Sequence, residues 1–148
     1  MVYKYSFIAS GQNFYPSRLI PKFTQEIIVE NYTDYGLETN KNFEYLDGRI
    51  LFWHPKKYST NDSLQFYEEQ FVSFIQKNYS IFVEAGAVDF EIFMEVYYDV
   101  EQCNFEIFDR DKLKILSAMN ISLPISIYAI GKSKLKRWEK EIIKDWEK

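Results

Sequence analysis

The clearest pattern in the chain is an alternation of apolar and polar positions over residues 88–99. One parity is apolar and consists of Val88, Phe90, Ile92, Met94, Val96 and Tyr98. The other is acidic and partly aromatic and consists of Asp89, Glu91, Phe93, Glu95, Tyr97 and Asp99. A period of two is typical of a strand that packs one face on a core. We therefore predict a strand with one buried face and one acidic face.

Shorter apolar runs predict further strands. They cover residues 2–10, 25–30, 48–53 and 122–130, and Pro124 places the last of these at a strand start or a sheet edge. After a turn near residues 100–101, Cys103, Phe105 and Ile107 continue the apolar parity. This pattern predicts one more strand, which forms a hairpin with residues 88–99.

Apolar residues at helical spacing predict four helices. The longest has about 20 residues and begins near Asp62 or Ser63, either of which can cap it. A short helix is predicted over residues 16–23, and a third follows Asp109. Residues 132–148 form a fourth, with Leu135, Trp138, Ile142 and Trp146 on one stripe.

The predicted order is β-α-β-β-α-β-β-α-β-α. Its first six elements match the ferredoxin-like βαββαβ order, and the later β-α-β extends the sheet. We expect an α+β fold, with a mostly antiparallel sheet and helices packed on one face. At 148 residues the chain has the length of one domain. Residues 1–131 are predicted to form it, with the amphipathic helix 132–148 docked on it.

Composition supports a sheet and an intracellular setting. Thirteen Phe, twelve Tyr and three Trp make up 19% of the chain, and aromatic residues favour strands and interfaces. The N-terminal residues do not resemble a secretory signal, and no apolar run approaches the roughly 18 residues of a membrane span. The single cysteine fits a reducing compartment. We expect a cytoplasmic protein.

Charge is distributed unevenly along the chain. Residues 132–148 carry seven Lys or Arg and four Asp or Glu, a net of +3, so the rest of the net −4 chain carries −7. An acidic body disfavours nucleic acid and favours a basic protein partner. Acidic residues interspersed in the last helix disfavour a membrane surface. That helix docks on its own domain or, alternatively, makes a homodimer contact with an acidic neighbour.

Catalytic, metal and cofactor sites are not expected. Cys103 and His54 are the one thiol and the one imidazole, but Cys103 shares the parity of core residues and His54 is expected at the surface. One His and one Cys leave zinc almost no ligands beyond carboxylates. The five glycines are dispersed, so a known phosphate-binding loop is absent. We predict a protein that is not an enzyme and has no cofactor.

The acidic strand face is the candidate binding site. If a tight turn pairs Asp99 with Gln102, Glu95 lies opposite Glu106. Facing like charges cost stability, and a basic partner would explain their presence. The predicted partner-binding residues are Glu91, Phe93, Glu95, Tyr97 and Glu106. The alternative is a solvated face that keeps the protein in solution.

Several short motifs resemble domain-of-unknown-function family 4279, a family of small bacterial proteins. They are residues 11–16 (Gly-Gln-Asn-Phe-Tyr-Pro), Trp53 at a strand end, the Ser63-Leu64 helix start, and residues 123–128 (Leu-Pro-Ile-Ser-Ile-Tyr). The resemblance spans about residues 3–130, and residues 24–46 depart from the family's pattern. It implies a compact α+β fold and brings no established activity or catalytic residues.

Two functions follow from the sequence as hypotheses. The first is a non-enzymatic protein-binding domain of the immunity-protein type, which inhibits a basic partner through its acidic and aromatic strand face. The second is a small-molecule sensor with a Tyr- and Trp-lined pocket between the sheet and the long helix. An enzyme would require His54 beside Cys103 in an open cleft.

Overall fold

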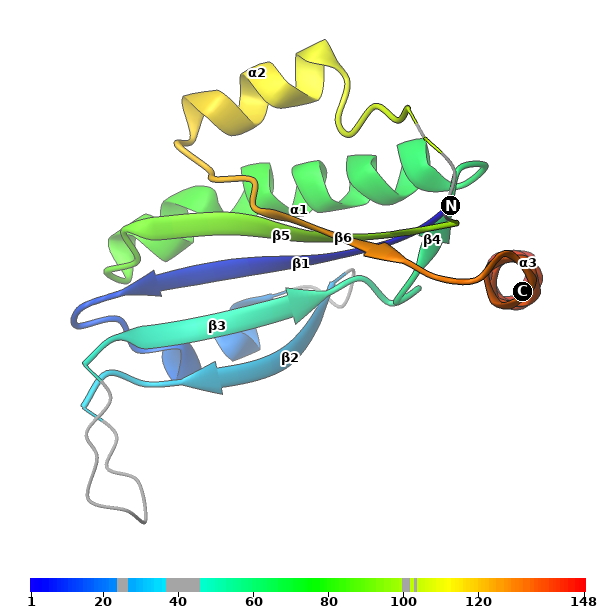
Figure 1. Cartoon of the computed structure of the whole chain (residues 1–148). Coiled ribbons are helices and arrows are strands. Elements are labelled where there is room, and N and C mark those ends of the chain that lie inside the picture. The colour runs from blue at the N-terminus through cyan, green and yellow to red at the C-terminus, as the bar shows by residue number, and fades with distance from the viewer. Residues whose placement is uncertain (24–26, 37–45, 100–101, 103) are drawn as a thin grey trace.

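A long first strand, β1 (Val2–Gly11), lies at the centre of a six-stranded sheet in the order β2-β3-β1-β5-β6, and β4 also pairs with β1. The computed structural model describes residues 1–23, 27–36, 46–99, 102 and 104–148. The other strands are β2 (Ile28–Thr33), β3 (Gly48–Trp53), β4 (Ser59–Thr60), β5 (Asp89–Tyr98) and β6 (Ile125–Ala129). The helices are the 3-10 turns η1 (Pro16–Arg18) and η2 (Ile20–Lys22), and α1 (Leu64–Glu84), α2 (Arg110–Ala118) and α3 (Lys132–Trp146). Figure 1 shows the twisted sheet with α1 along one side.

Strand pairing confirms the α+β class and the mostly antiparallel sheet. β1 is antiparallel to β3, β4 and β5, and β3 is antiparallel to β2. Only the β5–β6 ladder is parallel among the described strands, and α2 makes the crossover that a parallel pair needs.

The predicted hairpin after β5 is wrong. Residues 104–108 are not a strand, and β6 occupies the place beside β5. The backbone N–H of Phe108 donates to the buried carboxylate of Glu68 on α1, which draws this segment over the helix instead of into the sheet. Cys103, predicted to lie in the core, is outside the described residues.

The first face of the sheet carries the main core. Tyr3, Tyr5 and Phe7 of β1 point toward α1, and Phe71, Phe74 and Phe82 of α1 meet them. The rings pack edge-on and tilted, with centroids 5.0 Å apart for Phe52–Phe74 and 5.6 Å apart for Phe7–Phe82. Side chains therefore fill the space where the sequence suggested an aromatic ligand pocket.

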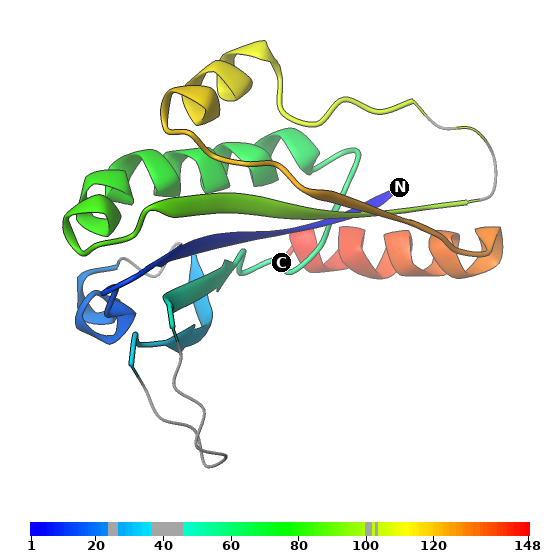
Figure 2. The same ribbon diagram turned by 60° about the vertical axis from the view of Figure 1, so that its left-hand side comes forward.

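The expectation that all helices lie on one face is wrong for α3. Leu135 and Ile142 of α3 pack on Val2, whose side chain points away from the main core. Trp138 meets Tyr97 of β5 with centroids 4.9 Å apart. Figure 2 shows α1 and α3 on opposite sides of the sheet. α3 covers only the end of the second face near Val2, and no helix of the described residues covers the rest of that face.

Candidate functional site

The uncovered part of the second face is hollow. A cavity of about 1030 Å³ lies over it, open to solvent. Strand register brings two rows of side chains together as its floor: Thr33, Arg49, Ser10 and Asp89 in one, and Asn31, Leu51, Ile8, Glu91 and Ser122 in the other. We call these nine residues the concave face.

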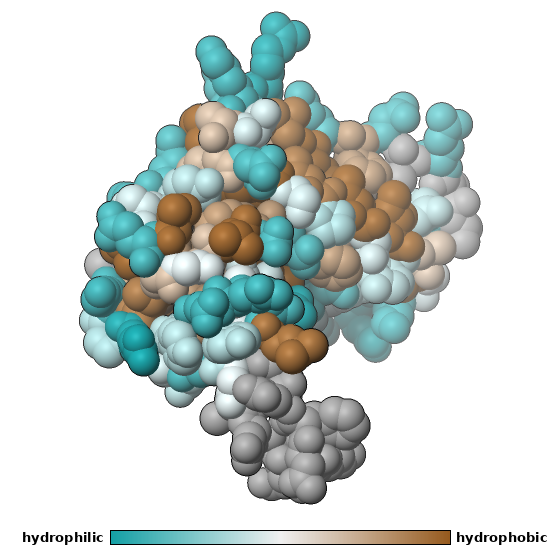
Figure 3. Space-filling view, turned by 90° about the vertical axis from the view of Figure 1, so that its left-hand side faces the viewer, coloured by the Kyte–Doolittle hydropathy of each residue, from teal (hydrophilic) through white to brown (hydrophobic). Residues whose placement is uncertain are grey.

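The rims of the concave face come from opposite edges of the sheet. Tyr32, Leu46 and Asp47 line it on the β2–β3 side, and Val88, Asn120 and Ile121 line it on the β5–β6 side. The register of β2 shifts between Val29 and Asn31, and such a bulge bends a strand and increases its twist. Viewed from the end of the sheet where β1 finishes and β5 starts, polar and apolar residues are interspersed (Figure 3).

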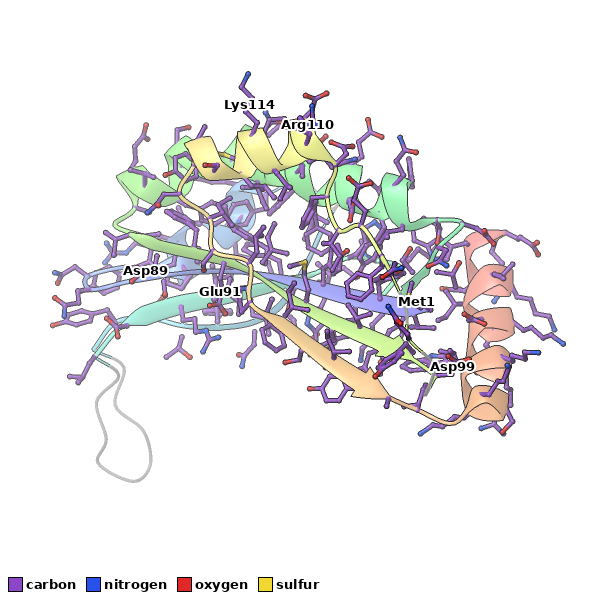
Figure 4. The ribbon with its side chains drawn as sticks, turned by 45° about the horizontal axis from the view of Figure 1, so that its top comes forward. Met1, Asp89, Glu91, Asp99, Arg110 and Lys114 are labelled. Carbon is purple, nitrogen blue, oxygen red and sulfur yellow. The ribbon has the colours of Figure 1, made fainter. Side chains whose placement is uncertain are left out.

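The concave face combines an apolar floor with acidic groups. Ile8 is buried at its centre beside the half-buried Leu51. The charged lining residues are Asp47, Asp89, Glu91 and Arg49, which gives a net charge of −2. In Figure 4, Asp89 and Glu91 extend from β5 on the side away from α2. A surface of this kind suits a partner that carries a cation next to an apolar group.

Four of the five predicted partner-binding residues share the second face, but their surroundings differ. Glu91 lines the cavity, and Phe93 follows one row along. Glu95 lies opposite Lys4, and their side chains form an ion pair at 2.5 Å. Tyr97 stacks on Tyr128 at 5.0 Å, under α3.

Glu106 does not belong to this face. It is exposed and lies in the irregular segment before α2, so the predicted pairing of Glu95 with Glu106 is wrong. The sequence pattern contained no sign that Lys4 would lie opposite Glu95, because that contact depends on the register of two strands about 90 residues apart.

Lys4 occupies the middle of the second face, where its side chain pairs with groups on both neighbouring strands. Its ammonium contacts Glu95 and lies 5.0 Å from the centre of the Trp53 ring, which also receives the ammonium of Lys57 at 4.2 Å. The hydroxyl of Tyr97 donates to Glu95 at 3.0 Å, and burial together with this carboxylate raises the pKa of Tyr97. Because these groups pair with one another, the acidic side chains of β5 that remain at the cavity are the exposed Asp89 and the half-buried Glu91.

His54 is buried, contrary to the sequence-based expectation. It is 3% exposed and stacks on Trp146 of α3 at 5.5 Å, with Tyr67 at 4.5 Å on α1. The backbone N–H of Lys56 donates to Nδ1 at 2.9 Å, so the ring proton is on Nε2 and donates to Oε1 of Gln70. Burial lowers the pKa of this imidazole. The rings of Tyr67, Phe71 and Trp146 pack around the imidazole. All three are distant in sequence, so the residues next to His54 gave no sign that it would be buried.

A second buried polar cluster joins β1, α1 and the segment before α2. Glu68 accepts from the hydroxyl of Tyr5 at 3.1 Å and from the N–H of Phe108 at 2.9 Å, and the Lys112 ammonium is 3.8 Å away. The hydroxyl of Tyr67 accepts from the N–H of Tyr5 at 3.0 Å. Burial raises the pKa of Glu68, Tyr5 and Tyr67. The satisfied hydrogen bonds are those of a structural network.

Comparison with known proteins returned no matching family model, no matching curated protein and no matching solved structure. The resemblance to domain-of-unknown-function family 4279 therefore stays an expectation. Within the described ranges, no helix is both long and apolar enough to cross a membrane. The same residues contain no group of three or more His, Cys, Asp or Glu side chains placed to hold a metal ion.

Proposed function

We propose that this protein is a non-enzymatic protein-binding domain of the immunity-protein type, which holds a basic partner on its concave face. One observation carries the proposal: the concave face is an acidic hollow on a sheet surface that no described helix covers. Ile8 and Leu51 provide an apolar centre, and Asp89 and Glu91 provide charge beside it. Apolar centres with charged surroundings are the usual anatomy of a specific interface.

Rigidity of the concave face supports the same proposal. Its floor consists mainly of strand residues, whose backbone is fixed by ladder hydrogen bonds on neighbouring strands. A rigid surface loses little conformational entropy when a partner binds. The carboxylates speed association with a basic partner and make it sensitive to salt.

The test is a pull-down from the native host with three baits: wild type, Asp89→Lys/Glu91→Lys, and Glu106→Lys. Reversing both charges on the concave face is expected to abolish capture of a basic protein. Glu106→Lys is the matched control, because it reverses an exposed charge outside the face. The wild-type complex is expected to weaken as salt increases. Equal capture by all three baits contradicts the proposal.

A small-molecule sensor remains the second candidate, because a cavity of about 1030 Å³ is large enough for a ligand. Its location differs from the expected one, since it lies on the second face and not between the sheet and α1. A metabolite that raises the melting temperature of wild type but not of Asp89→Lys/Glu91→Lys would favour this function over the first.

A further inference from the structure

The outer edge of β6 has the composition of a strand that pairs with another strand. β6 ends the sheet, and its five residues, Ile-Ser-Ile-Tyr-Ala, carry no charge. Ile125 is 48% exposed and Ile127 is 54% exposed. Edge strands are normally protected by charges, prolines or bulges. The other edge, β2, has such protection in the exposed Glu30 at its bulge.

Among the described strands, none pairs with this outer edge. The even-numbered residues bond to β5. The N–H groups of Ser122 and Ile130 donate to carbonyls of β5, and the carbonyls of Ser122 and Pro124 accept from N–H groups of β5. Because bonding direction alternates along a strand, the N–H and C=O of Ile125, Ile127 and Ala129 point away from β5. The backbone nitrogen of Pro124 faces β5. This proline therefore removes no hydrogen-bond donor from the outer edge and does not protect that edge from pairing.

We propose that two copies of this chain form a dimer by antiparallel pairing of their β6 strands about a two-fold axis at Ile127. This register sets Ile127 opposite the second copy's Ile127 and Ile125 opposite the second copy's Ala129. The residues whose backbone N–H and C=O point away from β5 then lie opposite the same kind of residue in the second copy. Each such pair exchanges two backbone hydrogen bonds. Ile125 and Ile127 of both copies form one apolar cluster on the first face.

Charge complementarity supports a second copy as the occupant. Residues 132–140, the first part of α3, contain five Lys or Arg and one Glu. Antiparallel pairing sets the end of one β6 beside the start of the other, so α3, which begins at Lys132 soon after β6, starts near the second copy's Ser122. In each copy Ser122 is bridged to Glu91, with Asp89 two residues before it on the same strand face. The basic start of each α3 therefore comes near Asp89 and Glu91 of the other copy.

The dimer does not rest on the proposed function. The two-fold axis stands perpendicular to the joined sheet, so both concave faces open on the same side. The dimer contact is made mainly by β6, whereas the proposed partner contacts the floor of the concave face. Asp89 and Glu91 serve both inferences, but Ile127, on which the dimer is tested, lies outside the concave face. The two inferences are tested with different substitutions and can fail separately.

Sedimentation equilibrium on the full chain tests the dimer. Wild type is expected to sediment with twice the 17.8 kDa mass of one chain. Ile127→Glu and Ile127→Lys each place like charges across the axis, and each is expected to be a monomer. An equimolar mixture of the two places Glu opposite Lys and is expected to restore the dimer.

Val83→Glu is the control, because Val83 is an apolar residue of similar exposure (47%) on α1. This variant is expected to dimerise like wild type, and circular dichroism checks that the Ile127 variants are folded. A monomeric wild type at the highest soluble concentration overturns the proposal. A dimer that survives in both single Ile127 variants, or folded variants whose mixture stays monomeric, also overturns it.

Discussion

At the scale of single residues, two glycines determine how closely β1 and β3 approach their neighbours. Gly11 and Gly48 lie opposite each other in the β1–β3 ladder. A Cβ on Gly48 would lie 1.8 Å from the carbonyl oxygen of Phe14, and one on Gly11 would lie 2.3 Å from that of Gly86. Both contacts are to backbone atoms, which cannot move away by changing a rotamer. The end of the sheet beside the concave face therefore depends on the absence of these two side chains.

Gly48→Ala is expected to lower the free energy of unfolding by about 3 kcal/mol, the upper range for inserting a group into packed surroundings. Urea denaturation gives the change as a shift of the midpoint. Gly131→Ala is the control, because a Cβ there meets nothing within 4 Å, and it is expected to change stability by less than about 0.5 kcal/mol. Equal stability of the two variants would contradict this packing.

His54 gives stability a defined dependence on pH. Because burial holds the pKa of His54 below the value of about 6.5 in an unfolded chain, its stabilising effect is complete above pH 6.5. As pH falls toward the folded pKa, the unfolded chain takes up a proton that the folded protein does not. The free energy of unfolding is therefore expected to decrease over this range.

His54→Asn tests this effect, since His54 is the sole histidine. The variant is expected to be less stable at pH 7 and to lose less stability than wild type between pH 7 and pH 5. Chemical denaturation at several pH values measures both slopes. Glu68 contributes the opposite slope in both proteins, because its raised pKa favours folding as pH falls. A wild-type slope retained in full by the variant would rule out His54 as its source.

At the scale of elements, the local sequence pattern predicted the bounds of β3 and β5 closely. It failed for segments whose structure is determined by contacts with residues distant in sequence. The predicted strand over residues 48–53 coincides with β3, and Asp109 caps α2 as expected, accepting from the N–H groups of Asp111 and Lys112. Apolar and polar residues alternate at the start of segment 104–108 as well, but the N–H of Phe108 donates to the buried carboxylate of Glu68 on α1, and the segment does not join the sheet. The short β4 and the break of helix 16–23 into η1 and η2 were not predicted. The predicted helix contains Pro21, which has no backbone N–H to donate to the preceding turn, and its residues form two 3-10 turns of three residues each.

Glu68 is the residue through which α1 organises the segment before α2. Glu68→Ala is expected to lower stability by about 1–3 kcal/mol, because the Tyr5 hydroxyl and the Phe108 N–H lose a buried acceptor. Glu68→Gln keeps an acceptor oxygen and is expected to be closer to wild type at neutral pH. Thermal unfolding compares the three proteins. If both substitutions cost the same, the charge of Glu68 matters more than its acceptor oxygen.

At the scale of the whole molecule, the sheet has one face that carries the main core, with only its β6 edge exposed, and one face that α3 covers only at its end. The sequence predicted the alternation of β5 and hence the acidic side that contributes Asp89 and Glu91. It did not predict the hollow, because Ser10, Arg49 and Leu51 come from strands whose register with β5 is set by long-range pairing. Nor did it predict that α3 would cover Tyr97 and bury His54.

The central position of β1 also has a consequence for the order of events during synthesis. Gly11 ends β1 and Asp89 begins β5, so β5 begins 78 positions after β1 ends. At about 5–20 residues per second, a ribosome needs about 4–16 s to produce that stretch. During this time the edge of β1 that pairs with β5 has no partner strand, and the Tyr and Phe side chains of β1 have no α1 to pack on. The nascent chain thus presents an aromatic strand to the cell before it can complete the centre of its own sheet, which is an interval in which chaperones would act.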